Sequence, residues 1–339
     1  MQAYLFCKNS TALNEVLSTI LAPYSKVFIL VDSHTAIDCL PILKIEKLVD
    51  IITIPASEEN KNSTQLLKIW EVLTTNFADR KSVLINLGGG MITDIGGFAA
   101  SCYKRGIDFI NIPTTILAQV DASIGGKTGI DFAGYKNQIG AFSFPIQTII
   151  APLFLDTLPQ REYKSGIAEM LKHYLIADEN AFTTFVNSTK ISDEQIENAI
   201  AIKLKFVEAD PMEKNIRKAL NFGHTIGHAI ESFLLNKNED ILHGEAVAAG
   251  MICESFIAYK KGLITIENLI QIKEKIDEIF PLIPIHENDF DAIIGYALPD
   301  KKNENSKVNF TLINGIGDYL INQTADSLLM KDALKFYGQ

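Results

Sequence analysis

The first half of the chain alternates short apolar runs with stretches that repeat apolar residues at helical spacing. Continuous apolar runs, typical of strands buried on both faces, lie at 27–32, 51–55, 82–87 and 108–113. Residues 62–77 have helical periodicity, with an expected buried face of Leu66, Leu67, Trp70 and Leu73. Strands that alternate with helices form parallel βαβ units. We therefore expect a doubly wound, Rossmann-like parallel sheet.

The pattern changes after Pro152. Long amphipathic stretches follow one another at 160–178, 193–209, 221–235, 243–261 and 265–279. An Asn314-Gly315 pair between two apolar runs predicts a small hairpin. The length of 339 residues suits about two domains. We predict an α/β fold, with a parallel-sheet domain at 1–150 and a mainly α-helical domain at 151–339.

The composition excludes several classes of protein. Hydrophobic residues make up 47% of the chain and charged residues 21%, which suits a globular protein and not a disordered one. The net charge is −10, so a general nucleic-acid binder is not expected, and an anionic ligand would need a local cluster of positive charge. No run approaches about 20 apolar residues, so we expect no membrane-spanning helix.

The cysteines and the N-terminus indicate a compartment. Cys7, Cys39, Cys102 and Cys253 are scattered, and no two of them form a C-x-x-C motif. The first residues lack the basic segment and long apolar run of a secretory signal. We therefore expect reduced thiols and a cytoplasmic protein.

Three consecutive glycines, Gly88 to Gly90, lie between a predicted strand and a helix expected from about Met91 to Tyr103. Glycines there let a phosphate approach the backbone, and the helix N-terminus supplies N–H donors. The G-x-G-x-x-G fingerprint is absent because Thr93 occupies its third glycine position. A tight turn without a ligand is the alternative. Asp32, at the end of the first run, suits either ribose hydroxyls or a helix cap.

The segment from Pro113 to Gly140, which we expect to be a loop, combines five glycines with hydroxyl, amide and ammonium groups. Such a composition is typical of a phosphate or polyol cradle, although a solvated loop is the alternative. Polar residues of this segment include Thr114, Thr115, Asp121, Lys127, Thr128, Lys136 and Asn137.

Histidines gather in the second half. His224 and His228 are four residues apart on one predicted helix, and His243 opens the next. This spacing is typical of a divalent metal site, but it does not choose which histidines bind. Glu169 and Lys172 share a helix face and predict either a structural ion pair or part of a site.

The chain has only four arginines, and two of them lie near these candidate sites. Arg105 follows the glycine helix, and Arg217 precedes the histidine pair. Arginine binds carboxylate and phosphate through two parallel hydrogen bonds, so both residues suit recognition of an anionic ligand. A surface salt bridge is the alternative for each.

Five segments together resemble the 3-dehydroquinate synthase family, in order, within residues 27–320. They are GGGMITDIGGFAASCYKRGIDFINIPTTILAQVDASIGGKTGID, KNQIGAF, LPQREYKSGIAEMLKHYLI, LNFGHTIGHAIE and LHGEAVAAGM. The resemblance implies conversion of 3-deoxy-D-arabino-heptulosonate 7-phosphate to 3-dehydroquinate and phosphate, a step of the shikimate pathway. It implies NAD-dependent oxidation, phosphate elimination, reduction by the same cofactor, ring opening and aldol closure.

The resemblance also implies roles for individual residues. Zinc or cobalt would be held by Glu169, His224 and His243, and His228 would contact the substrate instead. The NAD pocket would comprise Asp32, Glu58, Lys61, Gly89, Gly90, Asp94, Thr114, Thr115, Lys127, Lys136, Phe154 and Thr157. Substrate contacts would come from Arg105, Asp121, Lys127, Asn137, Lys172, Lys203, Glu213, Arg217, Asn221 and His228. A lysine of the Lys301-Lys302 pair would reach the site too.

Arg105 would enter the neighbouring subunit's site, so a homodimer is implied, without nucleic-acid or membrane partners. Two positions depart from the family pattern: Tyr135 stands where a glycine is usual, and His34 stands where an asparagine is frequent. The first departure puts the pose of Lys136 and Asn137 in question.

Three alternatives remain. A sister sugar-phosphate cyclase would not need Arg217 or the Lys301-Lys302 pair to bind a carboxylate. A metal-dependent polyol dehydrogenase would need no basic phosphate site. A non-enzyme descendant would have damaged metal or lysine positions, whereas these positions are intact here.

Overall fold

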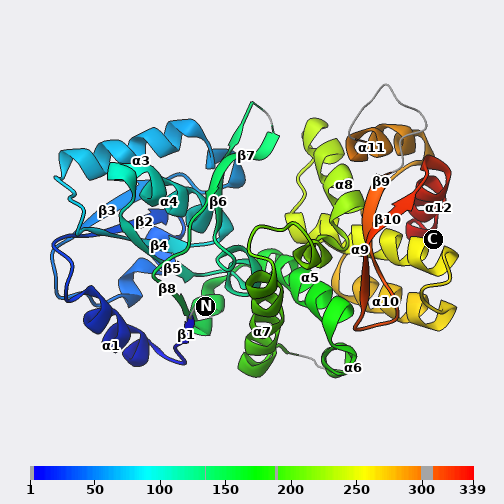
Figure 1. Cartoon of the computed structure of the whole chain (residues 1–339), viewed down its shortest axis with the longest axis horizontal. Helices are drawn as coiled ribbons and strands as arrows, with labels where there is room; N and C mark the ends of the chain where they lie inside the picture. The colour runs from blue at the N-terminus through cyan, green and yellow to red at the C-terminus, as the bar shows by residue number, and fades with distance from the viewer. Residues whose placement is uncertain (1–3, 134, 188–189, 299–307) are drawn as a thin grey trace. The chain divides into compact units, whose positions relative to one another are not determined.

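The structure is a computed structural model that describes residues 4–133, 135–187, 190–298 and 308–339. It divides into two compact units, Met1–Tyr163 and Lys164–Gln339 (Figure 1). The expected boundary near residue 150 falls at the end of a strand of the first unit. Among the described residues, no helix combines the length and the apolar character needed to cross a membrane.

The first unit is built on a six-stranded sheet whose neighbouring strands are all parallel. Its strands, in spatial order, are β1 (Tyr4–Phe6), β8 (Gln147–Ile150), β5 (Asp108–Pro113), β4 (Val83–Gly88), β2 (Val27–Asp32) and β3 (Val49–Ile54). Every residue of β2 and β4 is buried, as their continuous apolar runs predict. The predicted doubly wound parallel sheet is confirmed.

Helices cover both faces of this sheet (Figure 1). Val27, Ile29 and Val31 of β2 pack in one apolar cluster with α1 (Ser10–Leu21). Phe28 and Leu30 point the other way, into a second cluster with α3 (Ser63–Thr75) and α4 (Gly90–Cys102). Successive side chains of a strand alternate in direction, so one apolar run supplies both clusters. The remaining short elements are α2 (Thr35–Asp38), η1 (Leu40–Ile42), η2 (Glu58–Asn60), η3 (Tyr103–Arg105) and η5 (Pro152–Thr157).

The predicted inner face of α3 is wrong at one position. Leu67 is 62% exposed, whereas Ile69 is fully buried beside Leu66 and Leu73. Leu66, Ile69 and Leu73 are spaced by three and four residues and form one stripe, and Leu67 lies about 100° around the helix from it. Trp70 is half-buried and donates its indole N–H to Ala99 O at 3.0 Å.

The segment 113–140 is not the loop that we expected. After a short π-helical turn, η4 (Ala118–Ala122), it forms an antiparallel hairpin of β6 (Lys127–Phe132) and β7 (Tyr135–Phe142). The strands come close at Gly129 and Gly140, where a Cβ on Gly140 would lie 2.2 Å from Thr128 O. The glycine content that suggested a loop therefore serves close strand pairing.

The second unit is mainly helical, as predicted. Its helices are α5 (Gln160–Ala177), which begins in the first unit, α6 (Glu179–Val186), α7 (Asp193–Ala209), α8 (His224–Asn236), α9 (His243–Lys260), α10 (Ile266–Ile279), α11 (Phe290–Ala297) and α12 (Ser327–Tyr337). The short turns η6 (Ile216–Asn221) and η7 (Glu287–Asp289) accompany them. The predicted hairpin at Asn314-Gly315 is present as β9 (Val308–Ile313) and β10 (Tyr319–Ala325).

A buried amide pair crosses the centre of the first unit's sheet. Asn86 of β4 donates from Nδ2 to Asn111 Oδ1 of β5 at 2.9 Å, and the two residues are register partners. Helix α4 approaches this pair at Gly96, where a Cβ would lie 2.0 Å from Asn86 Oδ1. A glycine is therefore required for α4 to contact the sheet here.

Replacing Gly96 with alanine should destabilise the protein by about 1–3 kcal/mol, because the added methyl group displaces α4 or breaks the amide pair. Urea unfolding of the purified protein measures this change. Gly295→Ala on α11 is the matched control, because a Cβ there meets no atom within 4 Å. The control should be neutral or stabilising, and equal losses in both variants would contradict the packing argument.

Candidate functional site

Most residues of the expected cofactor pocket follow the carboxyl ends of parallel strands. Asp32 ends β2, Gly89 and Gly90 follow β4, and Thr114 and Thr115 follow β5. Glu58 and Lys61 come after β3, and Phe154 and Thr157 after β8. These strands are neighbours in one parallel sheet, so their carboxyl ends share one edge. Ligands of open α/β sheets bind outside that edge.

The glycine turn leaves the N-terminus of α4 open. Gly89 is the N-cap residue and supplies no side-chain acceptor, so the first N–H groups of this 13-residue helix can receive a ligand. The turn is also tight: a Cβ on Gly88 would lie 2.6 Å from Ile92 Cβ, and Thr114 N donates to Gly88 O. Both interpretations of the glycines therefore fit the same turn.

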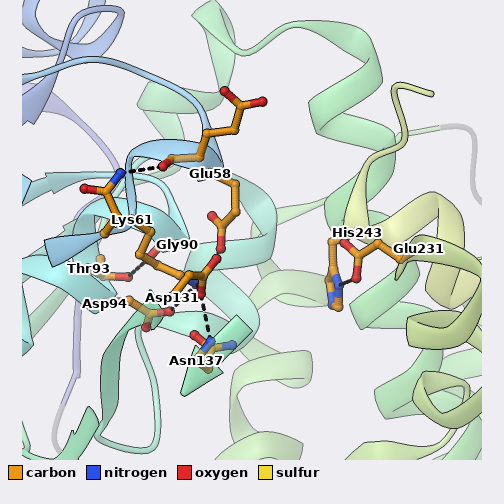
Figure 2. A network of polar contacts seen from close by, with 11 residues as sticks. Glu58, Lys61, Gly90, Thr93, Asp94, Asp131, Asn137, Glu231 and His243 are labelled. Carbon is orange, nitrogen blue, oxygen red and sulfur yellow. Dashed lines mark hydrogen bonds and ion pairs between the residues drawn. The ribbon is translucent and has the colours of Figure 1, made fainter. Parts of the chain in front are cut away.

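A buried lysine lies beside this turn. Lys61 is 3% exposed. Its ammonium group contacts three carboxylates: those of Glu58, of Asp94 at 3.4 Å and of Asp131 at 3.7 Å (Figure 2). Burial works to lower the pKa of Lys61, but the carboxylates of Asp94 and Glu58 outweigh it and hold the pKa above its usual value. Burial raises the pKa of Asp94 to about 7, aided by the charge of Glu58 and opposed by Lys61.

Other expected cofactor residues have clear structural roles. The Asp32 carboxylate accepts hydrogen bonds from His34 N at 2.8 Å and Thr35 N at 2.9 Å, which is the capping role raised as its alternative. Phe154 is 1% exposed, and its side chain belongs to an apolar cluster of the first unit. Thr157 donates to Phe154 O at 3.4 Å.

The hairpin presents three expected site residues, because Lys127, Lys136 and Asn137 are all exposed. Asn137 has a φ of +52°, in the left-handed region that asparagine tolerates better than most residues. Tyr135, which departs from the family pattern, is 69% exposed. Arg105 is also exposed, in a turn where Lys104, Arg105 and Gly106 have φ values of +50°, +68° and +114°.

Glu169 is the centre of a cluster in the second unit. It is 1% exposed on α5, and its Oε1 lies 3.4 Å from the Nε2 atoms of both His224 and His243. Its other oxygen forms an ion pair with the buried Lys172 ammonium. Among the described residues, Oε1 accepts no well-formed hydrogen bond. One carboxylate oxygen and two imidazole nitrogens therefore face one point.

Contacts at Nδ1 orient the imidazole rings of His224 and His243. His224 Nδ1 lies 3.1 Å from Phe222 O. His243 Nδ1 lies 3.6 Å from Glu231 Oε2, a contact that Figure 2 shows. Acceptors at Nδ1 favour the tautomer that leaves a lone pair on Nε2. This is the arrangement that metal-ligating histidines adopt in proteins.

Charges shift the pKa values of this cluster. Burial works to raise the pKa of Glu169, but Lys172 and His224 outweigh it and hold the pKa well below its usual range. Burial lowers the pKa of His224. Burial also works to lower the pKa of His243, but Glu169 and Glu231 outweigh it and raise the pKa to about 9.

Close helix packing brings the cluster together. A Cβ on Gly250 of α9 would lie 1.9 Å from Gly223 O, immediately before α8. A Cβ on Gly244, also in α9, would lie 2.0 Å from Ser165 O of α5. Helices in contact usually lie 8–10 Å apart, and glycines permit the closest approaches. Glu169, His224 and His243 come from these three helices.

A buried carboxylate that the sequence analysis missed fixes the start of α8. Glu254 of α9 is fully buried and accepts from Gly223 N at 2.7 Å and Ile226 N at 3.0 Å. A carboxylate at these free N–H groups stabilises a helix N-terminus. Glu254 thereby holds the turn of α8 that carries His224.

Three of the expected substrate residues of the second unit line a cavity of about 520 Å³. Glu213, Asn221 and His228 line it together with His224, and Asn221 Nδ2 donates to Glu213 Oε1 at 3.1 Å. Asn309, Thr311 and Asn322 of the β9–β10 hairpin also line it and were not predicted. Lys203 and Arg217 are buried, and Arg217 Nη1 donates to Pro211 O at 2.7 Å.

His228 remains geometrically able to join a metal site. Its ring lies 5.1 Å from that of His224 and 5.5 Å from that of His243, and one nitrogen of each of the three rings lies within 4.8 Å of the others. Its exposed position in the cavity wall also suits a substrate contact. The Lys301-Lys302 pair lies outside the described residues.

Solved structures with the same fold define its class. The chain has a TM-score of 0.85 and 24% identity to 2-epi-5-epi-valiolone synthase from Streptomyces hygroscopicus subsp. jinggangensis 5008, with NAD⁺ and Zn²⁺ bound, covering 100% of this chain and 97% of that one. It has a TM-score of 0.65 and 13% identity to glycerol dehydrogenase from Schizosaccharomyces pombe, covering 99% and 90%. The fold is thus one that the chain shares with a 2-epi-5-epi-valiolone synthase and a glycerol dehydrogenase.

Sequence comparison gives the family. The family models for 3-dehydroquinate synthase match residues 51–165 with the N-terminal part and residues 166–303 with the C-terminal part. The chain is 41% identical over 348 aligned residues to the 3-dehydroquinate synthase of Parabacteroides distasonis, covering all of this chain and 98% of the relative. It is 42% identical to that of Campylobacter hominis, covering 80% and 79%. The chain belongs to the 3-dehydroquinate synthase family.

The elevated pKa of Asp94 predicts a pH-dependent stability. The folded state holds a proton on Asp94 up to about pH 7, whereas the unfolded state releases it near pH 4, so this group's contribution to the free energy of unfolding falls as pH rises between those values. Asp94→Asn should remove that fall. Urea unfolding of the metal-free, NAD-free protein at about pH 5 and about pH 8 checks this, and identical pH slopes in variant and wild type would contradict it.

Proposed function

We propose that the protein is a 3-dehydroquinate synthase that uses NAD and a zinc or cobalt ion. It converts 3-deoxy-D-arabino-heptulosonate 7-phosphate to 3-dehydroquinate and phosphate. Membership of the family and 41% identity along the whole chain to a curated 3-dehydroquinate synthase support the assignment. The observation that carries it is the cluster of Glu169, His224 and His243 around one point.

These residues fit a divalent ion. One carboxylate oxygen and two imidazole nitrogens are a common donor set for zinc, and three protein ligands leave a position open for substrate. The unsatisfied Glu169 Oε1 and the acceptors at both Nδ1 atoms support the same assignment. When bound, the ion polarises a substrate oxygen and NAD accepts and returns a hydride.

We propose the first unit as the NAD-binding domain and the second as the metal- and substrate-binding domain. The open N-terminus of α4 after Gly89 suits a pyrophosphate. Thr114, Thr115 and the Lys61–Asp94 pair share the edge of the sheet where dinucleotides bind in this class of fold. The NAD⁺ named for the valiolone synthase structure supports this placement.

Different residues of the second unit would stabilise charge, bind hydroxyl groups and transfer protons during the reaction. Lys172 forms an ion pair with Glu169 and is placed to stabilise negative charge near the metal position. The Glu213–Asn221 pair offers both an acceptor and a donor to hydroxyl groups, while His228 offers an imidazole for proton transfer. Lys203 and Arg217 supply the local positive charge that an anionic substrate requires in a protein of net charge −10.

We also propose a homodimer in which Arg105 reaches the partner's site. The exposed turn at Lys104–Gly106 holds the Arg105 backbone in one unusual conformation, which suits a contact outside its own subunit. The cytoplasmic location expected from the cysteines stays a prediction.

The first test is turnover. Purified protein with NAD⁺, zinc and the heptulosonate phosphate should release phosphate without net accumulation of NADH, because the hydride returns within each cycle. A chelator should abolish the release, and added zinc should restore it. Accumulating NADH would indicate a polyol dehydrogenase. Phosphate release from sedoheptulose 7-phosphate but not from the heptulosonate phosphate would indicate a sister cyclase.

Lys172→Ala should retain NAD binding and lower turnover by about 10²-fold or more, because it removes the ammonium beside the metal position. Calorimetric NAD titration and phosphate release measure the two effects separately. Lys205→Ala, an exposed lysine on α7, is the matched control and should behave as wild type. Wild-type turnover in Lys172→Ala would remove its proposed role.

Mixing two inactive variants tests the shared site. In a heterodimer of Arg105→Ala and Lys172→Ala subunits, one of the two sites has both its own Lys172 and an intact partner Arg105. Random exchange of equal amounts should therefore restore about a quarter of wild-type activity. No recovery, with exchange verified by differently tagged subunits, would exclude a contribution in trans.

A further inference from the structure

The β6–β7 hairpin contains an irregularity opposite Asp131. Ile130 pairs with Ile139, but Phe132 pairs with Tyr135, so one residue of β6 lies opposite three residues of β7. The extra residues lie within 136–138, and Asn137 there has a φ of +52°. Bulges of this kind redirect side chains and are frequent beside active sites. Lys136 and Asn137, both expected site residues, are thus the residues that the bulge presents.

Asp131 holds this bulge by a side-chain hydrogen bond. Its Oδ1 accepts from Asn137 N at 2.7 Å, which satisfies a donor that regular strand pairing would otherwise satisfy (Figure 2). A left-handed backbone is unusual for a non-glycine residue, so a side-chain hydrogen bond to Asn137 N helps to hold Asn137 in this one conformation.

Asp131 also joins the hairpin to the buried lysine. Its backbone N–H donates to Lys61 O at 2.7 Å, and its Oδ1 lies 3.7 Å from Lys61 Nζ. Lys61 contacts Asp94 on α4, one turn after the glycine turn. The sequence of contacts from Asn137 through Asp131 and Lys61 to Asp94 therefore connects the exposed bulge to the start of α4.

We infer that Asp131 is a positioning residue, which fixes the Lys136–Asn137 bulge against Lys61 so that both side chains are presented in one pose. This inference rests on the proposed function for the roles of Lys136 and Asn137. Asp131 itself need not touch a ligand: it acts through the backbone of Asn137 and the ammonium of Lys61.

Two substitutions separate the two contacts. Asp131→Asn keeps an oxygen that can accept from Asn137 N but removes the charge that pairs with Lys61, whereas Asp131→Ala removes both. We expect Asp131→Ala to lower kcat/KM by about 10–100-fold, the range typical of residues that orient functional groups, and Asp131→Asn to recover most of that loss. Gln138→Ala, an exposed neighbour in the same bulge, is the matched control and should keep wild-type kinetics.

Hydrogen exchange of the peptides covering 135–142 gives a readout independent of turnover. Exchange should become faster in Asp131→Ala and stay close to wild type in Asp131→Asn and Gln138→Ala. Wild-type exchange and wild-type kcat/KM in Asp131→Ala would overturn the inference. If the wild-type protein released no phosphate, the proposed function would fail, and the exchange data with NAD affinity would still decide the role of Asp131. Equal losses of kcat/KM in Asp131→Asn and Asp131→Ala, with hydrogen exchange unchanged in both, would mean that only the charge of Asp131 matters. That result would also overturn the inference that Asp131 positions the bulge.

Discussion

The close approach of α5, α8 and α9 is the constraint on which the second unit depends. Gly244 and Gly250 leave no room for a Cβ against Ser165 O and Gly223 O. Larger residues there would separate the helices by ångströms, whereas a metal site tolerates only tenths of an ångström in its ligand distances. Glu254 completes the arrangement by fixing the first turn of α8 from α9. The positions of Glu169, His224 and His243 are therefore a result of backbone packing.

Each unit buries a charged group, but the buried charge is negative in one unit and positive in the other. Around Glu169 in the second unit, one buried carboxylate faces a lysine and two histidines, and it stays ionised. Around Lys61 in the first unit, one buried ammonium faces three carboxylates, and one of these holds a proton near neutral pH. A lone buried charge would cost several kcal/mol, so each unit retains its charged group only within a cluster. The Glu169 cluster offers a carboxylate oxygen and two imidazole nitrogens to a cation. The Lys61 cluster instead has more carboxylates than ammonium groups.

Helices and strands that depend on a local pattern of apolar residues could be predicted from the sequence. The apolar runs of β2, β4 and β5 and the long periodic helices of the second unit needed no tertiary information. The hairpin β6–β7 was mistaken for a loop because β7 is exposed and the segment 113–140 contains five glycines. Strand β1 was missed because it has only three residues. Histidine spacing indicated His224 and His228, but Glu169 reaches the cluster from another helix and was assigned as a metal ligand only through the family resemblance. Asp131, Glu231 and Glu254 were missed since their roles depend on contacts between elements, which a local pattern does not contain.

The buried pair of Asn86 and Asn111 has a consequence for the folding of the sheet. Two valines or isoleucines at these positions would bury more apolar surface, so the amides give up some stability. The amides do, however, discriminate between registers. If β4 slid along β5 by one residue, each amide would face an isoleucine or a leucine and lose its hydrogen-bond partner. Central strands with uniform apolar runs have little else to distinguish one alignment from the next. The pair therefore favours one register of β4 and β5 during folding. In that register Gly88 and Pro113 are partners, so the two turns on the cofactor side begin at the same edge of the sheet.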